Sequence, residues 1–164
     1  MSYFIRPKKI EDCLSCAKVA ILSWNETYRG IVDDLFLDEI LLKEEETAQK
    51  ERDSFFDDTS KYVLEVDGKV VGFINFGRAH TVGYDGYGEI YSFYILKKYH
   101  GFGYGKEMFL YALQELRKDY SKVIVGCLKD NPTTKFYEHM GGRIVQTHQR
   151  PTGNSILEEN IYEL

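Results

Sequence analysis

The chain has 164 residues, a formal net charge of −5 and 43% hydrophobic residues. This length is typical of one domain with its own core, and the composition argues against a disordered chain. Proteins that bind nucleic acid through phosphate contacts are usually basic, so the acidic balance disfavours nucleic acid as a partner. We therefore expect a single folded domain over residues 1–164.

The N-terminal half predicts one strand, two helical regions and a hairpin. Residues 3–6 form the strand, and a helix follows from about residue 12 to about residue 28, with its apolar side chains on one face. A second, interrupted helical region covers residues 31–50. The β-type runs 61–66 and 69–76 are joined by Asp67-Gly68, which is a strong signal for a β-hairpin.

The C-terminal half alternates strands with helices. After a glycine- and tyrosine-rich loop (77–88), a strand is expected at 89–96, a helix at 103–120 and an apolar interior strand at 122–128. A turn at 130–132 precedes a short helix at 133–140, and strands at 143–149 and 155–162 end the chain. The order β-α-α-β-β-β-α-β-α-β-β predicts a mixed α/β fold, with an antiparallel meander followed by β-α-β crossovers.

The chain shows no signal for secretion, membrane insertion or metal binding. Residues 1–10 contain no apolar signal core, and the longest apolar stretch, 70–76, is far shorter than the ~20 residues of a membrane span. Cys13, Cys16 and Cys127 are too few for a disulfide framework, and the Cys13–Cys16 pair lacks further zinc ligands. We expect a cytoplasmic protein without a metal or a membrane partner; redox chemistry at the cysteine pair stays open.

The most informative segment lies between the strand at 89–96 and the following helix. Gly101, Gly103 and Gly105 alternate there, and the side chains of Lys97, Lys98, His100 and Lys106 add positive charge. Glycines before a helix N-terminus let backbone N–H groups approach an anionic ligand such as a pyrophosphate. The spacing matches neither the dinucleotide fingerprint nor the P-loop. A tight turn without a ligand remains the alternative for this segment alone.

His100-Gly101-Phe102-Gly103-Tyr104-Gly105 resembles the acetyl-CoA loop, Q/R-x-x-G-x-G/A, of the GNAT superfamily of N-acetyltransferases, with His100 in the Gln/Arg position. Phe136-Tyr137-Glu138, the preceding Asn131 and the segments 4–7 and 24–30 are also similar to that family. The resemblance implies a central, twisted, mostly antiparallel sheet of about seven strands flanked by about four helices. It also implies a bulge that splays strand 89–95 from its neighbour.

The resemblance implies a role for several residues. Tyr137 would be the general acid beside the thioester sulfur, and a backbone N–H of Tyr94 or Ile95 would stabilise the oxyanion. Asn131 would contact the cofactor arm, or would only complete the turn before Pro132. The residues expected to bind acetyl-CoA are Phe93, Tyr94, Ile95, His100, Gly101, Phe102, Gly103, Tyr104, Gly105, Lys106 and Asn131.

Acetyl transfer to an amine also needs a proton acceptor, because a lysine-like amine with a pKa near 10.4 is almost fully protonated at neutral pH. Glu89, at the start of its strand, is the candidate base; a solvated strand-end glutamate is the alternative. Trp24, Tyr28 and Tyr91 are expected to line the acceptor pocket. Three further carboxylates would attract a cationic amine or be merely solvated: Asp33, Asp34 and Asp85.

Together these features predict an N-acetyltransferase that moves an acetyl group from acetyl-CoA to a primary amine by direct attack in a ternary complex. The motif segments contain no cysteine, which disfavours a covalent thiol intermediate. A polyamine or other small amine is the first expected acceptor, a protein N-terminus or lysine the second, and an aminoglycoside or amino-acid-like amine the third. A non-catalytic CoA-binding module is the alternative from another class, and the family resemblance also implies a homodimer through the late strands.

Overall fold

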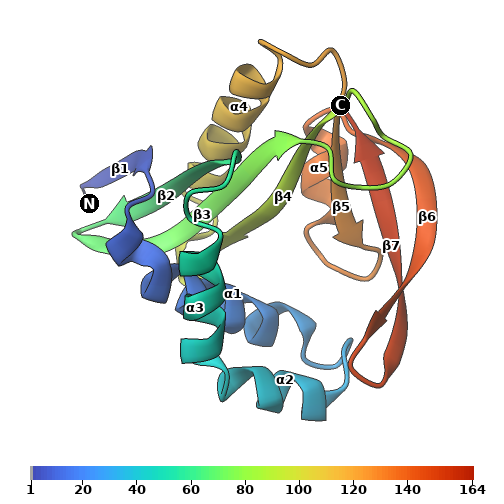
Figure 1. Ribbon diagram of the computed structural model, residues 1–164. Coiled ribbons are helices and arrows are strands. Elements are labelled where there is room, and N and C mark those ends of the chain that lie inside the picture. The colour runs from blue at the N-terminus through green and yellow to red at the C-terminus, as the bar shows by residue number, and fades with distance from the viewer. Residues whose placement is uncertain (1) are drawn as a thin grey trace.

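The computed structural model describes residues 2–164, which form a sheet of seven strands in the order β1-β2-β3-β4-β5-β7-β6 (Figure 1). Neighbouring strands are antiparallel except β4 and β5, which are parallel. The strands are β1 (Tyr3–Pro7), β2 (Ser60–Val66), β3 (Lys69–Arg78), β4 (Gly88–Ile95), β5 (Val123–Leu128), β6 (Arg143–Thr152) and β7 (Ser155–Glu163).

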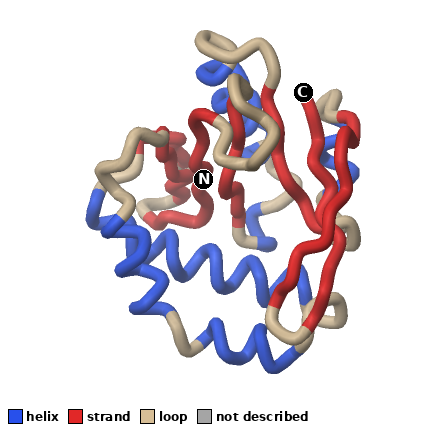
Figure 2. The backbone as a smooth tube through the Cα atoms, turned by 45° about the vertical axis from the view of Figure 1, so that its right-hand side comes forward, coloured by secondary structure: helices blue, strands red, loops and turns tan. Residues whose placement is uncertain are grey.

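Residues 2–164 also form five α-helices, which cover the two faces of the sheet (Figures 1 and 2). The first three pack together on one side, and the last two lie on the other. They are α1 (Cys13–Tyr28), α2 (Asp34–Leu41), α3 (Glu44–Asp53), α4 (Tyr104–Leu116) and α5 (Thr134–His139), with short 3-10 turns η1 (Ile10–Asp12) and η2 (Lys97–Tyr99). Within this described part of the chain, no helix combines the length and apolarity needed to cross a membrane.

The mixed α/β fold and its seven-stranded sheet confirm the prediction from sequence. The interrupted region 31–50 resolves into two helices, because the Asp33 side chain accepts the Phe36 N–H to begin α2 and the chain turns at Leu42 before α3 begins. The fold therefore has one helix more than the four expected. The last helix residue of α4 is Leu116, four residues before the predicted end at Tyr120.

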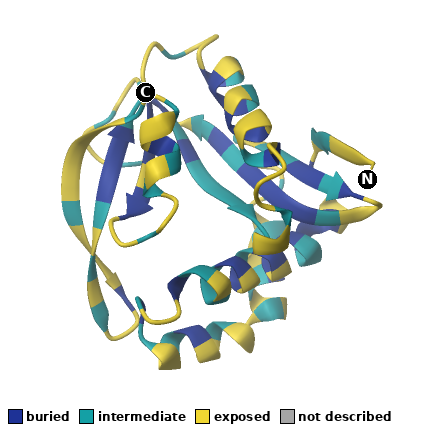
Figure 3. Cartoon of the chain, turned by 180° about the vertical axis from the view of Figure 1, so that it is seen from behind, coloured by how far each residue is buried: buried dark blue, intermediate teal, exposed yellow. Residues whose placement is uncertain are grey.

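The main core lies between the sheet and α4. Buried α4 residues recur every three to four positions and include Met108, Phe109, Ala112 and Leu116. Strand β5 is almost entirely apolar and mostly buried, as expected for an interior strand, whereas β6 lies at the edge of the sheet and is mostly exposed (Figure 3).

The two predicted hairpins form. Asp67 and Gly68 have φ values of 48° and 79°, the positive pair that a two-residue turn with the twist of the strands requires. The last hairpin is longer than expected: β6 continues to Thr152 and β7 starts at Ser155, so only Gly153 and Asn154 form its turn.

The sheet splits in the middle, and this split creates the site. The pairing of β3 with β4 skips from Ser92 to Ile90, so Tyr91 is an extra, bulged residue in β4. Strand β4 pairs with β5 only from Gly88 to Ile90, and the two strands then diverge. The bulged, splayed strand that the family resemblance implied is therefore present.

Candidate active site

Two connected cavities lie at the split between β4 and β5. The first, which we call the β4–β5 pocket, has a volume of about 250 Å³ and is bounded by α1, β4, β5, the residues before α5, and the β6–β7 hairpin. The second, the glycine-loop groove, has a volume of about 370 Å³ and follows the loop before α4. The cavities share a boundary, made of Phe93, Ile95, His100, Thr133 and Tyr137.

The glycine-loop groove is built mainly from backbone. Gly101 and Gly103 have φ values of 83° and 87°, a region that residues with a side chain seldom adopt. Gly103 is the N-cap of α4, so the first amide groups of this helix have no helical acceptor and point toward the loop. Together with Lys106 in the groove wall, they form a site suited to an anion.

His100 fixes the start of this loop to the end of β4. Its Nε2 lies 2.7 Å from the Ile95 carbonyl oxygen and donates to it, because a carbonyl only accepts. The sequence left open what a histidine does in this position. In the structure its ring lines both cavities and orients the loop.

The second half of β4 offers backbone groups to a ligand. Within residues 2–164, Ser92 to Ile95 pair with β3 on one side, while no strand pairs with them on the side facing β5. Buried backbone groups need hydrogen-bond partners. An extended ligand with amide groups that lay in the split would supply them.

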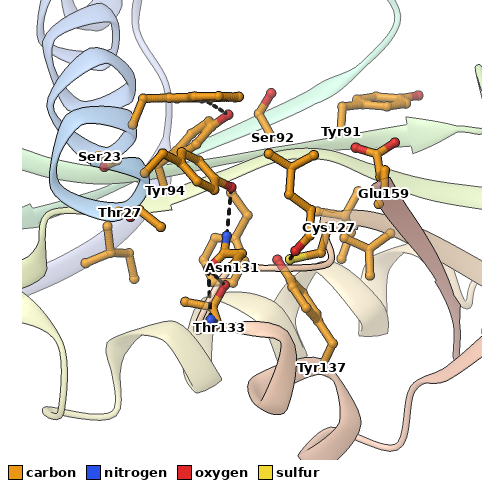
Figure 4. A pocket seen from close by; sticks show the side chains of 18 of the residues that line it. Ser23, Thr27, Tyr91, Ser92, Tyr94, Cys127, Asn131, Thr133, Tyr137 and Glu159 are labelled. Carbon is orange, nitrogen blue, oxygen red and sulfur yellow. Dashed lines mark hydrogen bonds between the residues drawn. The ribbon is translucent and has the colours of Figure 1, made fainter. Parts of the chain in front are cut away.

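Tyr137 stands where the two cavities meet. It comes from α5, is only 7% exposed, and its hydroxyl points toward Cys127 (Figure 4). Burial raises the pKa of this phenol above its usual value of 10. The hydroxyl therefore keeps its proton at physiological pH and is able to donate it.

Cys127 on β5 also lines the β4–β5 pocket, although the sequence motifs did not include it. Burial, with a contribution from the negative charge of Glu159, raises the pKa of this thiol to about 11. At neutral pH the group is a protonated thiol, which is a poor nucleophile. Its place in the pocket therefore gives no support to a covalent route.

Asn131 joins α1 to the segment that begins α5. Its amide donates to the Tyr28 hydroxyl over 2.8 Å, and its side-chain oxygen accepts from the N–H and hydroxyl of Thr133, each at 2.8 Å. The residue lies in the β4–β5 pocket but not in the glycine-loop groove. The structure thus shows the turn role; a contact with the cofactor arm remains a prediction.

The three residues expected in the acceptor pocket all line the β4–β5 pocket. Trp24 donates from Nε1 to the Tyr94 hydroxyl over 3.1 Å, and its ring packs on that of Tyr28. Tyr91, at the opposite end, stacks on His80 and donates its hydroxyl to the Arg78 carbonyl.

Glu89, the expected base, lies outside both cavities. Its carboxylate accepts hydrogen bonds from the N–H groups of His80 and Thr81 and from the Thr81 hydroxyl, all at 2.9–3.0 Å. It therefore closes the loop before β4 instead of facing the pocket. The expected acidic residues Asp33, Asp34 and Asp85 do not line the pocket either; Asp33 caps α2.

The structure brings most of the expected cofactor residues to the groove, but not all of them. Tyr94 faces α1 and lines only the β4–β5 pocket, Phe102 is exposed, and the Tyr104 ring is buried against Tyr3. These three residues do not line the groove. The expected residues that line it are Phe93, Ile95, His100, Gly101, Gly103, Gly105 and Lys106.

The sequence did not point to the two charged residues of the β4–β5 pocket, Glu159 and Arg150, nor to hydroxyl-bearing residues such as Ser23. Glu159 on β7 accepts from Arg150 Nη1 over 2.6 Å, and the Nε2 of His148 lies 3.1 Å from its other oxygen. Because side chains alternate along a strand, the sequence can indicate which residues of β6 and β7 share a face. Nothing in the sequence shows that this face borders the split between β4 and β5. Among residues 2–164, no group of three or more His, Cys, Asp or Glu side chains is placed to hold a metal ion.

Comparisons with known proteins agree with this geometry. The model of the acetyltransferase (GNAT) family matches residues 21–142. An uncharacterized N-acetyltransferase, YuaI, of Bacillus subtilis (strain 168) is 31% identical over 138 residues, which cover 82% of this chain and 76% of YuaI.

Two solved structures show the same fold. The PaiA N-acetyltransferase of Thermoplasma acidophilum, in complex with coenzyme A, has a TM-score of 0.73 at 23% identity, covering 99% of this chain and 98% of that one. YncA of Salmonella typhimurium, described as a putative acetyltransferase with its cofactor acetyl-CoA, has a TM-score of 0.68 at 17% identity, covering 100% and 94%.

Proposed function

Because the chain belongs to the acetyltransferase (GNAT) family, we propose that it transfers an acetyl group from acetyl-CoA to a small primary amine by direct attack in a ternary complex. The single observation that carries this proposal is the split between β4 and β5, with a backbone-lined groove on one side and a polar pocket on the other.

The residues of the groove fit acetyl-CoA. The α4 N-terminus, the two glycines with positive φ and Lys106 suit the pyrophosphate. The unpaired edge of β4 suits the amide groups of the pantetheine arm. Related acetyltransferases of the same fold were solved with coenzyme A and with acetyl-CoA, which supports this assignment.

Bound acetyl-CoA supplies a thioester whose C–S bond breaks as a C–N bond forms, so the ammonium form of the acceptor loses two protons, one to solvent and one to the departing sulfur. Tyr137 donates the proton to the sulfur and regains one from the nitrogen. The N–H of Tyr94 or Ile95 stabilises the negative charge on the thioester oxygen. Since Glu89 lies outside the pocket, we assign the first deprotonation to water within it.

Two measurements test the proposed function together. The first follows thiol release from acetyl-CoA with spermidine, the L-amino acids, peptides with a free N-terminus and kanamycin; the second detects the acetylated amine by mass spectrometry. We expect stoichiometric thiol release and acetylation with at least one amine. Acetyl-CoA binding without acetylation of any amine would contradict the proposal and indicate a CoA-binding module.

A further inference from the structure

The charges in the β4–β5 pocket form a balanced pair. Among the described residues that line it, Glu159 is the one carboxylate, and Arg150 is the one side chain with a permanent positive charge. Arg150 Nη1 lies 2.6 Å from Glu159 Oε2, and His148 Nε2 approaches Oε1 at 3.1 Å. A lone ammonium group would therefore compete with Arg150 for Glu159, whereas a ligand that also carries an anion for Arg150 would not.

Glu159 is held inside the pocket by the shape of the sheet. A Cβ atom at Gly126 would lie 3.1 Å from the Glu159 carboxyl carbon and from one of its oxygens. A side chain at this position of β5 would press on the carboxylate, which lies over the strand with its side chain just 14% exposed. Figure 4 shows Glu159 near Tyr91, at the opposite end of the pocket from Ser23.

Arg150 acts on the pocket as well as on Glu159. Arg150 and Tyr94 line the same pocket, so the guanidinium and the hydroxyl-bearing wall border the same space. Arg150 has five N–H donors, and the bond to Glu159 uses one of them, so others remain for an anionic group of a ligand.

The wall of the pocket also contains a buried polar group. Ser23 on α1 is 7% exposed and lines the pocket, and its hydroxyl has no hydrogen-bond partner within the described chain. A buried hydroxyl without a partner is destabilising, and this one is closed off from solvent, so it belongs to the pocket wall and is not assigned as a contact of the acceptor.

We propose that the acceptor is a small amphoteric amine, which carries a carboxylate beside its amino group as an α-amino acid does. Its carboxylate binds Arg150, and its ammonium group binds Glu159. This inference rests on the proposed function and specifies its acceptor class. A polyamine carries two or more positive charges, which Arg150 would repel. The pocket offers it one carboxylate, Glu159, which is already paired with Arg150.

Matched acceptors test this directly. The rates of acetylation are compared for the L-amino acids, for their α-carboxamides, which keep the amine and lose the anion, and for spermidine. We expect kcat/KM to favour an amino acid over its carboxamide by at least about tenfold, the effect of one charge-assisted hydrogen bond. In R150Q this preference disappears, whereas R143Q, on the same strand but outside the pocket, retains it.

A second pair of variants tests the role of Glu159 separately from that of Arg150. E159Q is expected to raise KM for the amino acid about tenfold or more without changing the affinity for acetyl-CoA, and E158Q, its exposed neighbour, is expected to behave as wild type. Equal rates with acid and carboxamide, a preference for spermidine, or an unchanged preference in R150Q would each overturn the inference. Acetyl-CoA binding without acetylation of any amino acid would also overturn it, while failure to bind acetyl-CoA would instead refute the proposed function.

Discussion

The glycine-loop groove and the β4–β5 pocket are adjacent, but they are built in different ways. Most of the groove comes from one continuous segment, residues 93–106, and much of its surface is backbone. The pocket is assembled from side chains of α1, β4, β5, the α5 entry and the last hairpin, which are up to 136 positions apart in sequence, from Ser23 to Glu159.

This difference determines how much of each region can be predicted from the sequence. A backbone cradle depends on glycine conformation and on a helix N-terminus, so it leaves a compact motif. A side-chain pocket depends on which segments the fold brings together, so its identity is spread over the chain. We expect the groove to bind the group shared by the family, and the pocket to select the acceptor.

The largest expected effect falls on Tyr137, which belongs to both regions. Tyr137→Phe removes the proton donor and keeps the ring in place, so kcat should fall by about 100-fold or more while the affinity for acetyl-CoA stays the same. Steady-state kinetics and calorimetry measure the two quantities. Tyr162→Phe, a change in a buried ring beside Tyr137 that does not line either cavity, is the control.

If Y137F and Y162F lower kcat equally, the effect is one of packing and Tyr137 is not the acid.

The next largest expected effect is the pH dependence of kcat/KM in the wild type. Since burial raises the pKa of Tyr137 above 10, the phenol stays protonated across the range in which the amine becomes neutral. We expect kcat/KM to rise by up to about tenfold per pH unit below the pKa of the amine. No decline should appear before pH 9.5; a decline below pH 9 would show that an acid with a lower pKa is required.

Gly105→Ala tests the groove alone. A Cβ there would contact Ile95 and Phe93 at 3.7–3.8 Å, which is ordinary packing, and it would stand in the groove. We expect acetyl-CoA to bind about tenfold more weakly, while the free energy of unfolding increases by up to about 1 kcal/mol, because alanine favours a helix more than glycine does. Calorimetric titration should therefore show a lower affinity for acetyl-CoA, while thermal unfolding should show a more stable protein. Unchanged affinity would place the ligand elsewhere.

Cys127→Ala distinguishes direct attack from a covalent thiol route. Because the pKa of the thiol is raised to about 11, we expect the variant to keep kcat within about threefold of wild type. Mass spectrometry of the wild type after incubation with acetyl-CoA alone should show no acetylated cysteine. Loss of activity in C127A together with an acetyl adduct on the wild type would contradict the ternary-complex mechanism.

The smallest effect on rate is expected for Glu89, which the sequence suggested as the base. Glu89→Gln weakens the hydrogen bonds that close the loop around Thr81, so the free energy of unfolding should fall by about 1 kcal/mol. The value of kcat should stay within about twofold. A drop of 100-fold without a change in stability would return Glu89 to the catalytic site.

The fold was largely predictable because its signals are local. The Asp67-Gly68 turn, the apolar face of α4 and the apolar strand β5 each follow from a short stretch of sequence, and the structure contains all three. The end of α4 was placed too late, since the residues after Leu116 continue as turns that a periodic pattern does not distinguish from helix.

The candidate site was predictable where it is contiguous and not where it is assembled. The glycine loop and Tyr137 carry motifs, and the structure brings them together. The position of Glu89 could not be predicted in this way. Alternation along β4 indicates on which face of the strand its carboxylate lies, but it does not show that the N–H groups of a loop bind that carboxylate. Glu159 and Arg150 lie on an ordinary hairpin, and only the split between β4 and β5 makes them part of a pocket.

The central claim is that the split sheet holds acetyl-CoA in the glycine-loop groove. Calorimetric titration of the purified protein with acetyl-CoA and, separately, with NAD tests it most directly. We predict binding of one acetyl-CoA per chain in the micromolar range, about tenfold weaker in G105A, with no heat from NAD. Binding of NAD, or no binding of acetyl-CoA to the wild type, would contradict the account.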